Sequence, residues 1–424
     1  MASSIISRNP VIRIAITHLV AKRRQTLVAM MGVTFGLAIF IFLGGLITGF
    51  QTIFIDKIVN TSANVHIYNG ADNTRKSLYQ QYFPASTDWV VVQHQKPKDL
   101  KLKIKNSNFI INEIEHDPAV EGVSPFLGGQ VIFRSGSVQK AGQIAGVDIR
   151  KEDHLFNVSK YMIAGDVLKL ETTSNGVILG SGLAEDLGVQ LNDMVTLVSQ
   201  EGISLDLKVV GIHESGLVTI DKSRAFVKLI TAQKLLNKEG SYITDINIKV
   251  KDIEQAEGLA KLYGAKYGYQ AHHWKQDNEA AFSVFKVQNL VMYLVIVSIL
   301  VVSGFGIFNI QMMIIHDKMG DIAILKALGY KDRDVRRIFL AESLVIGVIG
   351  GLLGLLLGYI LTEIISRIPM NVNSIVSLKY LPFNKEPLFY VVAFVFGLIA
   401  TGIAGYLPAR KAAKIDPVDI IRGK

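Results

Sequence analysis

Four long stretches without a charged side chain constrain this chain more than any other feature. They run over Gln25–Ile55, Val287–Ile315, Ser343–Thr362 and Pro387–Leu407. The shortest has 20 residues, and a helix of that length spans about 30 Å, the thickness of the hydrocarbon core of a bilayer. We therefore expect an α-helical membrane protein with four transmembrane helices.

The positive charge of the chain lies beside these stretches. Lys plus Arg number 45 and Asp plus Glu 36, a formal balance of +9. Residues 1–26, 316–337 and 408–424 together carry +10, so the rest of the chain carries −1. Basic flanks of transmembrane helices face the cytoplasm, which predicts cytoplasmic termini. The same distribution argues against nucleic-acid binding, because no separate soluble domain is basic.

This topology predicts the organisation of the whole chain. The segments are a cytoplasmic amphipathic N-terminal helix (1–24), transmembrane helices at 25–55, 287–315, 338–362 and 387–407, a large extracytoplasmic domain (56–286), a cytoplasmic loop (316–337), a short outer loop (363–386) and a cytoplasmic tail (408–424). The N-terminal helix, Val11–Val20, has Ile12, Ile16, Leu19 and Val20 on one side and is expected to lie in the membrane interface. The alternative for this segment is an ordinary basic flank.

The extracytoplasmic domain is predicted to be α+β. Strands are expected at Val65–Tyr68, Val177–Leu179 and Ile243–Val250, a hairpin at Met194–Ser199 and Ile203–Gly211, and helices at Asn108–His116, Ser181–Leu187, Ala225–Leu236 and Ile253–Tyr263. The β-rich middle, about 140–217, is interpreted as an insert between two parts of another subdomain, about 56–139 and 218–275. Without a cysteine, this domain depends on its own packing.

Glycines at a spacing of four residues mark the third stretch. They are Gly347, Gly350, Gly351, Gly354 and Gly358. Glycines at this spacing line one helix face and let a neighbouring backbone approach closely. The pattern predicts tight packing of transmembrane helices and says nothing about a substrate.

The cytoplasmic loop contains a short apolar helix, predicted between Asp321 and Gly329. Ile322, Leu325 and Leu328 are too apolar to lie bare in the cytoplasm. From the residues alone, a protein partner and the membrane interface are equally good explanations.

Several chemistries have no support in the sequence. No Asp, Glu, Lys or Arg falls in the centre of a transmembrane stretch, which argues against ion-coupled transport. The phosphate-binding pattern of nucleotide hydrolases is missing, so any ATP and Mg²⁺ would be bound by another chain. His272 and His273 are adjacent and lack the spacing of a metal site, so we expect no metal, no cofactor and no catalytic residue.

Three features together resemble the permease domain of MacB/FtsX-type ABC transporters. They are the Ala-Ile-Leu-Lys-Ala-Leu-Gly core within 321–330, the glycine-rich third stretch, and the run from Pro408 to Val418. One helix, a large outer domain and three further helices cover the whole chain. Trp274, Phe282, Phe308-Asn309-Ile310 and residues 177–192 are similar to the lipoprotein-releasing permeases.

The resemblance implies a bacterial inner-membrane protein that works with two copies of a cytoplasmic ABC ATPase and with a second permease, identical or different. The outer domain would be periplasmic, with a porter part and a β-rich insert. The loop helix would dock the ATPase through Asp321, Ile322, Ala323, Leu325, Lys326, Leu328 and Gly329, with Lys326 at the rim of the groove. The first two helices would continue outward as stalks that transmit motion. A lipidated cargo would lie between them, facing Phe42, Leu46, Phe50, Met292 and Val295.

The resemblance leaves more than one function open. The leading interpretation is the permease of an ATP-driven system that extracts or exports a lipidated or hydrophobic substrate, foremost by lipoprotein release. The alternatives are a non-transporting transducer that controls a cell-wall hydrolase, and an exporter of drugs or glycolipids with a membrane-fusion partner. The turn Gln200-Glu201-Gly202 is short where a chaperone-recruiting permease has a long loop, so recruitment of a periplasmic chaperone by this chain is in doubt.

Overall fold

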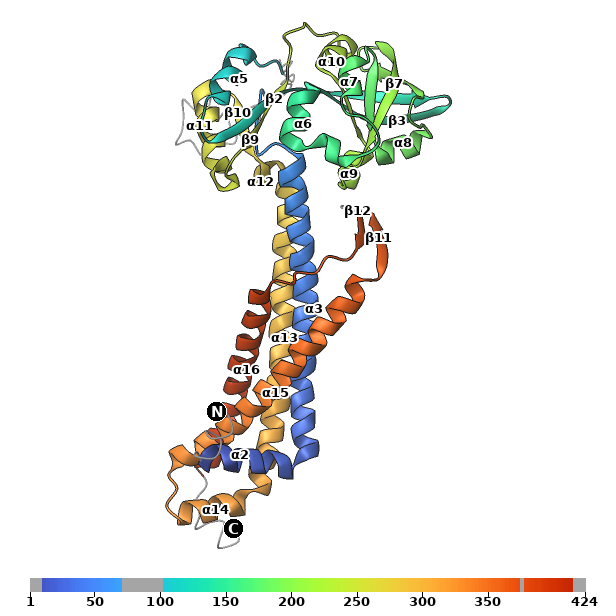
Figure 1. The fold of residues 1–424 in the computed structure, drawn as a ribbon. Coiled ribbons are helices and arrows are strands. Elements are labelled where there is room, and N and C mark those ends of the chain that lie inside the picture. Colours follow the sequence, from blue (N-terminus) through green and yellow to red (C-terminus); the bar gives the residue numbers. More distant parts are fainter. Residues whose placement is uncertain (1–9, 71–101, 374–376, 415–424) are drawn as a thin grey trace, which may run out of the picture. The chain divides into compact units, whose positions relative to one another are not determined.

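The computed structural model describes residues 10–70, 102–373 and 377–414 (Figure 1). The contacts within the chain divide it into two compact units. The first comprises residues 1–53, 283–371 and 379–424, and the second comprises residues 54–282 and 372–378. Residues 1–9 of the N-terminal flank and the part of the predicted tail beyond Lys414 lie outside the described residues.

The described residues include four helices that are long and apolar enough to cross a membrane: α3 (Arg23–Thr61), α13 (Glu279–Asp317), α15 (Asp332–Ser366) and α16 (Pro387–Ala413). Most of their length belongs to the first unit. The four predicted transmembrane helices are thereby confirmed. Helices α3 and α13 have 39 residues each, about 58 Å at the usual rise per residue. They are longer than a bilayer requires because the polar residues beyond each apolar stretch continue the helix without a proline.

A short helix, α2 (Pro10–Ala21), precedes α3. Proline at its first position leaves no backbone donor unsatisfied there. Ala15 and Leu19 are buried against the bundle, whereas Arg13 and Thr17 are exposed. Val20, which we placed on the apolar side, is 51% exposed. The described residues therefore leave part of the apolar face of α2 uncovered.

Two smaller elements complete the segments between the long helices. Helix α14 (Met319–Ala327) lies between α13 and α15, and Gly329 follows it with a φ of +97°. Strands β11 (Pro369–Asn373) and β12 (Ser377–Tyr380) form a two-stranded sheet.

The second unit is a ten-stranded mixed sheet with helices. Its strands are β1 (Val65–Tyr68), β2 (Val120–Ser135), β3 (Val138–Val147), β4 (Met162–Gly165), β5 (Gly176–Gly180), β6 (Met194–Ser199), β7 (Ser204–His213), β8 (Arg224–Lys228), β9 (Asp245–Val250) and β10 (Gln270–His273). Its helices are α5 (Ser107–Glu115), α6 (Ile149–Phe156), α7 (Lys169–Thr172), α8 (Ser181–Leu187), α9 (Val218–Asp221), α10 (Leu229–Leu235), α11 (Ala256–Tyr267) and α12 (Trp274–Asp277), with 3₁₀ turns η1 (Val158–Tyr161) and η2 (Ile253–Gln255).

Six of these strands close into a ring. Each pairs with the next in the order β2, β3, β8, β5, β7, β6, and β6 pairs again with β2. The ring encloses an apolar core that includes Phe133, Leu179, Leu197 and Leu207, all fully buried. It takes in β3 and β8, so it reaches beyond both ends of the predicted insert at 140–217.

The other end of the sheet runs β10, β1, β9, β2, with antiparallel pairing throughout. Ile67 and Ile248 are fully buried there. Strand β2 takes part in both halves: its first residues pair with β9 and its later ones with β6. One strand thus joins the two parts of the unit.

The predicted helix at Ala225–Leu236 is wrong in its first part. Residues 224–228 form β8, and the helix α10 begins only at Leu229. Ala225 and Val227 are fully buried between neighbouring strands. A short apolar run of this kind does not distinguish a buried strand from a buried helix. Here the residues form a strand because they pair with β3 and β5.

Candidate functional site

The predicted docking helix is α14, and one of its faces packs on the chain's own helices. Ile322 and Ala323 are each 1% exposed. Ile322 belongs to an apolar cluster with Ile314 and Ile315 of α13, Phe339 of α15 and Ala412 of α16. Our expectation that Ile322 fills a groove on a partner is therefore wrong, because the neighbouring helices already cover it.

Lys326 also differs from the prediction. Its Nζ donates a hydrogen bond to the backbone oxygen of Ala413, 2.8 Å away, and lies 3.0 Å from a carboxylate oxygen of Asp332. The side chain is 13% exposed. A cation beside the last carbonyls of a helix stabilises that helix end. Lys326 thus closes the C-terminal end of α16 rather than standing at the rim of a groove.

The opposite face of α14 is apolar and open. Ile324 is 58% exposed and Leu328 is 74% exposed, whereas Leu325 is half-buried. Asp321 and Gly329, the predicted ends of the segment, are both exposed; the helix itself begins two residues earlier, at Met319. The residues available to a partner are therefore Ile324 and Leu328, with Asp321 at the N-terminal end.

The glycines of α15 face two different helices. A β-carbon at Gly350 would lie 3.0 Å from the backbone oxygen of Met30 in α3, and one at Gly354 would lie 2.9 Å from that of Thr34. The hydroxyl of Thr34 donates to the backbone oxygen of Gly350 at 3.1 Å. Helices α3 and α15 therefore touch backbone to backbone.

The remaining three glycines extend this packing. A β-carbon at Gly358 would lie 3.0 Å from Cβ of Ile41 in α3, and one at Gly351 would lie 2.8 Å from the ring of Phe394 in α16. At Gly347 a β-carbon would overlap Thr401 of α16. Two glycine rows, 350–354–358 and 347–351, thus hold α15 against α3 and α16 respectively.

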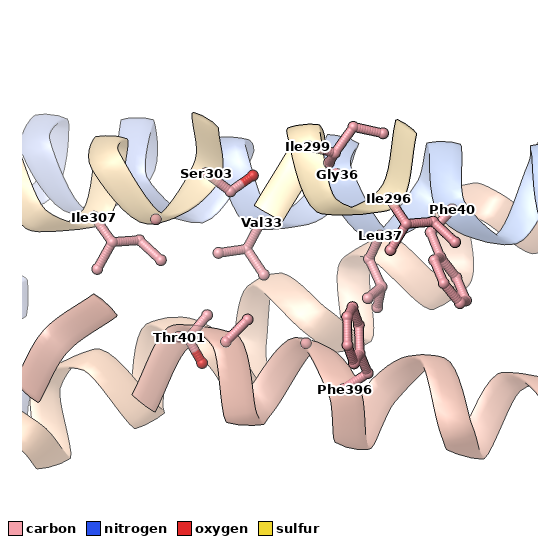
Figure 2. Close-up of a pocket in the computed structure, with 13 residues that line it drawn as sticks. Val33, Gly36, Leu37, Phe40, Ile296, Ile299, Ser303, Ile307, Phe396 and Thr401 are labelled. Atoms are coloured by element: carbon pink, nitrogen blue, oxygen red, sulfur yellow. The ribbon is translucent and has the colours of Figure 1, made fainter. Parts of the chain in front are cut away.

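A small pocket lies where α3, α13 and α16 meet (Figure 2). Its volume is about 40 Å³, and Val33, Leu37, Ile299 and Phe396 are among its apolar lining residues. Known sites for small ligands measure about 300–1,000 Å³. This pocket is therefore a packing gap and too small for a lipid chain.

The residues predicted to face a cargo lie elsewhere on α3 and α13. Phe42 packs against Phe383, with ring centroids 5.3 Å apart, and Met292 lies beside Gly44. None of Phe42, Leu46, Phe50, Met292 and Val295 is among the residues that line the two pockets described for the membrane unit. Their role as a cargo surface stays a prediction.

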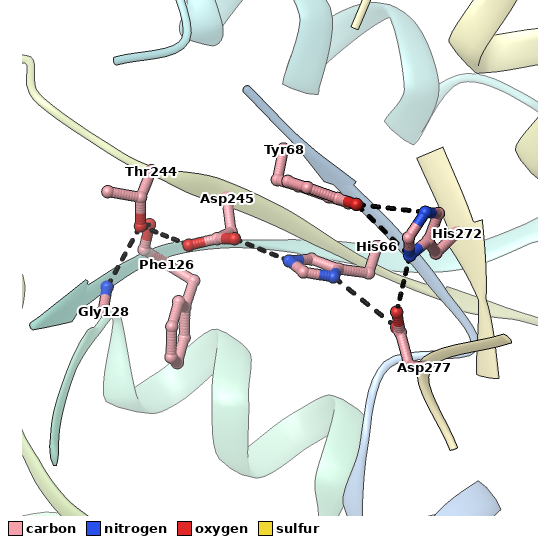
Figure 3. Close-up of polar contacts among 8 residues, drawn as sticks. All are labelled: His66, Tyr68, Phe126, Gly128, Thr244, Asp245, His272 and Asp277. Atoms are coloured by element: carbon pink, nitrogen blue, oxygen red, sulfur yellow. Dashed lines mark hydrogen bonds and ion pairs between the residues drawn. The ribbon is translucent and has the colours of Figure 1, made fainter. Parts of the chain in front are cut away.

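A cluster of charged groups occupies the second unit, and the sequence did not indicate it (Figure 3). Nε2 of His66 lies 2.6 Å from Oδ1 of Asp245, and its Nδ1 lies 3.5 Å from Oδ2 of Asp277. Nδ1 of His272 lies 3.1 Å from the other oxygen of Asp277, and the hydroxyl of Tyr68 is 3.0 Å from Nε2 of His272. Strands β1, β9 and β10 and helix α12 are tied together here.

Burial lowers the pKa of His66, but the hydrogen bonds and charges of Asp245 and Asp277 outweigh it and raise the pKa to about 9. Burial raises the pKa of Asp277, yet the two histidines hold it below its usual value. His66 is thus a cation between two carboxylates. Among the described residues, no three His, Cys, Asp or Glu side chains are arranged to hold a metal ion.

Two family models match the chain. The model of the FtsX-like permease C-terminal region matches residues 293–417. The model of the MacB-like periplasmic core domain matches residues 26–262, more than half of the chain. The chain belongs to the MacB/FtsX-type permeases of ABC transporters. The resemblance inferred from the motifs is confirmed, as are the membrane α-helical fold class and the α+β domain between the first two spans.

Similar proteins come from two groups of this family. The lipoprotein-releasing system transmembrane protein LolC of Xylella fastidiosa (strain 9a5c) is 25% identical over 445 residues, 98% of this chain and 99% of the relative. LolE of Haemophilus influenzae is 24% identical, covering 73% of this chain and 79% of the relative. The macrolide export ATP-binding/permease protein MacB of Burkholderia lata is 23% identical, and the match covers 96% of this chain and 56% of the relative. The crystal structure of the periplasmic region of MacB from Actinobacillus actinomycetemcomitans matches at 15% identity and a TM-score of 0.34, covering 54% of this chain and 97% of that chain.

The family models and these relatives indicate that the chain is a multi-pass inner-membrane protein with a periplasmic domain. They also indicate that the permease works with an ABC ATPase. Helix α14 lies inside the segment matched by the FtsX-like model. The cluster around His66 lies in the periplasmic unit, and most of it falls in the matched MacB-like region. The second unit is accordingly called the periplasmic domain below.

Proposed function

We propose that this chain is the permease subunit of an ATP-driven transporter that extracts lipidated substrates from the inner membrane, as in lipoprotein release. The relative LolC matches over nearly the whole length of both chains. ATP hydrolysis then takes place on a separate ATPase subunit, which binds ATP and Mg²⁺, and this chain binds no cofactor. Two ATPase copies and a second permease complete the complex.

The exposed apolar face of α14 carries this proposal. Ile324 and Leu328 are more than half exposed on a short helix between two membrane helices. Burying a Leu or Ile side chain stabilises a complex by roughly 1.5–3 kcal/mol. The buried face of the same helix contacts α13, α15 and α16 through Ile322. A push on α14 would therefore reach three membrane helices at once, and this contact supports mechanical transmission from the ATPase to the periplasmic domain.

The topology and the cargo surface belong to the same proposal. The basic flanks favour cytoplasmic termini, and they put α14 on the side where ATP is available. The cargo is proposed to contact Phe42, Leu46, Phe50, Met292 and Val295 on α3 and α13. Membrane lipids, which surround these helices, are a further partner in this proposal.

The experiment is purification of the ATPase with a tagged permease. Ile324→Asp and Leu328→Asp each place a carboxylate on the open face of α14 and should abolish both ATPase co-purification and substrate-stimulated ATP hydrolysis. Leu325→Asp, at a half-buried position, tests the original assignment. The matched control is Arg333→Asp, which places a carboxylate at an exposed position in the first turn of α15 and leaves α14 intact. Wild-type binding by both α14 variants would reject the docking role.

An exporter of drugs or glycolipids with a membrane-fusion partner is the second candidate. The macrolide exporter MacB of Burkholderia lata matches 96% of this chain. Mass spectrometry of the purified complex separates the two, because a co-purified lipoprotein supports the first function and a co-purified membrane-fusion protein supports the second.

A further inference from the structure

A long apolar groove runs along one side of the membrane unit, between α2, α3 and α15. Its volume is about 960 Å³. Met31 and Phe35 of α3 form one wall, and Ile349, Leu353 and Ile360 of α15 form the other. These five side chains are 42–55% exposed, so nothing among the described residues fills the groove.

The glycine contacts explain why this groove exists. Gly350 and Gly354 bring the backbones of α15 and α3 into contact. The larger side chains of the two helices project on either side of this contact and form the two walls of the groove. Helix α2 closes one end with Ile16 and Val20. The lining on α15 extends from Val345 to Ile360, about 22 Å along the helix axis.

The closed end of the groove is also its polar end. Arg23 is its one charged lining residue among the described part of the chain, and Thr26 lies beside it. Nε of Arg23 donates to the backbone oxygen of Val20 at 3.3 Å, and no carboxylate of the described residues forms an ion pair with Arg23. The hydroxyl of Thr26 donates a hydrogen bond to the backbone oxygen of Leu19 at 3.0 Å. The guanidinium is therefore available to an anion.

We propose that this groove binds a phospholipid of the surrounding membrane, with an acyl chain along α3 and α15 and the phosphate at Arg23. The groove is longer than one leaflet of the hydrocarbon core, about 15 Å, so it accommodates an acyl chain from its glycerol end to its methyl end. Arg23 begins the first membrane helix, at the depth of the headgroups. A guanidinium matches a phosphate with two parallel hydrogen bonds. The inference does not depend on the transported substrate.

The experiment uses the full chain with its partner subunits in vesicles of phosphatidylethanolamine and phosphatidylglycerol. A trace of phosphatidylglycerol carries a photoactivatable group in its acyl chain, and labelled residues are mapped by mass spectrometry. Met31 and Phe35 should be labelled more strongly than Ile403, which is 67% exposed on α16, lies outside the groove and the proposed cargo surface, and reports the bulk lipid.

Two pairs of variants test the two ends of the site. Leu353→Trp fills the groove and should remove the excess label on Met31 and Phe35. Leu352→Trp, at the preceding position of α15 and outside the groove, should not. Arg23→Gln should lower the labelling about fivefold, the effect of one basic residue at a lipid surface, and Arg24→Gln should leave it near wild type.

Three results would overturn the proposal. Labelling of Phe35 equal to that of Ile403 would mean ordinary contact with bulk lipid. Disulfide formation between Phe35→Cys chains of one complex would mean that a second copy occupies the groove. Displacement of the label by a lipidated peptide alone, with no effect of Arg23→Gln, would assign the groove to cargo. Elution of each variant at the wild-type volume in size-exclusion chromatography verifies that the complex is intact.

Discussion

Nδ1 of His18 in α2 lies 2.7 Å from a carboxylate oxygen of Glu342 in α15, 324 positions away along the chain. Glu342 is fully buried, and its second carboxylate oxygen has no hydrogen-bond partner in the described structure. The ring of His18 also lies against Phe339, with centroids 6.2 Å apart. This contact fastens the N-terminal helix to the third membrane helix.

We predict that His18→Ala destabilises the protein strongly. The substitution leaves a buried carboxyl group without its hydrogen-bond partner, which costs about 1–3 kcal/mol, and more when the group is charged. Thermal unfolding in detergent measures the effect. Adding Glu342→Gln to His18→Ala should recover part of the loss, because the unpaired charge is then gone. An unchanged unfolding midpoint for His18→Ala would contradict the pairing.

Gly354→Leu should force α3 away from α15. A β-carbon at this position already approaches Thr34 and Leu37 to 2.9 Å, and overpacking of this kind costs about 1–3 kcal/mol. Gly306→Leu in α13 is the control, because nothing lies within 4 Å of a β-carbon there. Both variants are compared by thermal stability in detergent, and equal stability would show that the glycine row is dispensable.

The stability of the periplasmic domain should fall as the pH rises from 7 to 9. His66 has a pKa of about 9 in the folded chain against 6.5 unfolded. Between these two values the folded chain keeps a proton on His66 that the unfolded chain releases. The contribution of His66 to the free energy of unfolding is therefore complete below pH 6.5 and is lost as the pH passes 9. The amount is on the order of 3 kcal/mol.

Two other groups limit the pH window for this measurement. Burial raises the pKa of Glu152 to about 7 and lowers that of His213 to about 4, so Glu152 still titrates around pH 7, whereas His213 does not. Thermal unfolding of the full chain, followed by tryptophan fluorescence, is therefore compared between pH 8 and 9, above both values, to isolate His66. His66→Gln should flatten the profile, whereas His154→Gln, an exposed histidine, should keep it. A sloping profile in His66→Gln would reject the assignment.

The predicted topology can be checked with single cysteines, because the chain has none. Ser174→Cys, at an exposed position of the periplasmic domain, should react with a membrane-impermeant thiol reagent in intact cells. Ser7→Cys, in the N-terminal flank, should react only after lysis. The reverse labelling pattern would invert the proposed orientation of the membrane helices.

The sequence predicted well those features that depend on neighbouring residues. The four membrane helices follow from long runs without charge, and α8 matches its prediction at both ends, with Gly188 at a φ of +65°. The glycine spacing in α15 can be recognised from the sequence of that helix alone. These patterns are local, so they can be read without knowledge of the fold.

Features that depend on distant residues were missed or assigned wrongly. Ile322 looked like a partner contact because its own partners, Phe339 and Ala412, come later in the chain. Glu342 and His18 are unremarkable singly, and no spacing rule joins them. The cluster around His66 likewise assembles from strands β1, β9 and β10 and helix α12, which only the folded sheet brings together.

Strand β2 has 16 residues and belongs both to the closed ring and to the open end of the sheet. A strand can slide past its neighbour only by shifting register, and a shift of one residue turns every buried side chain to the opposite face. Phe133 and Val123, both buried on β2, oppose such a shift at either end. The ring and the open end of the sheet are therefore held in a fixed register on one continuous strand, and neither part can shift along β2 without exposing buried side chains of the other.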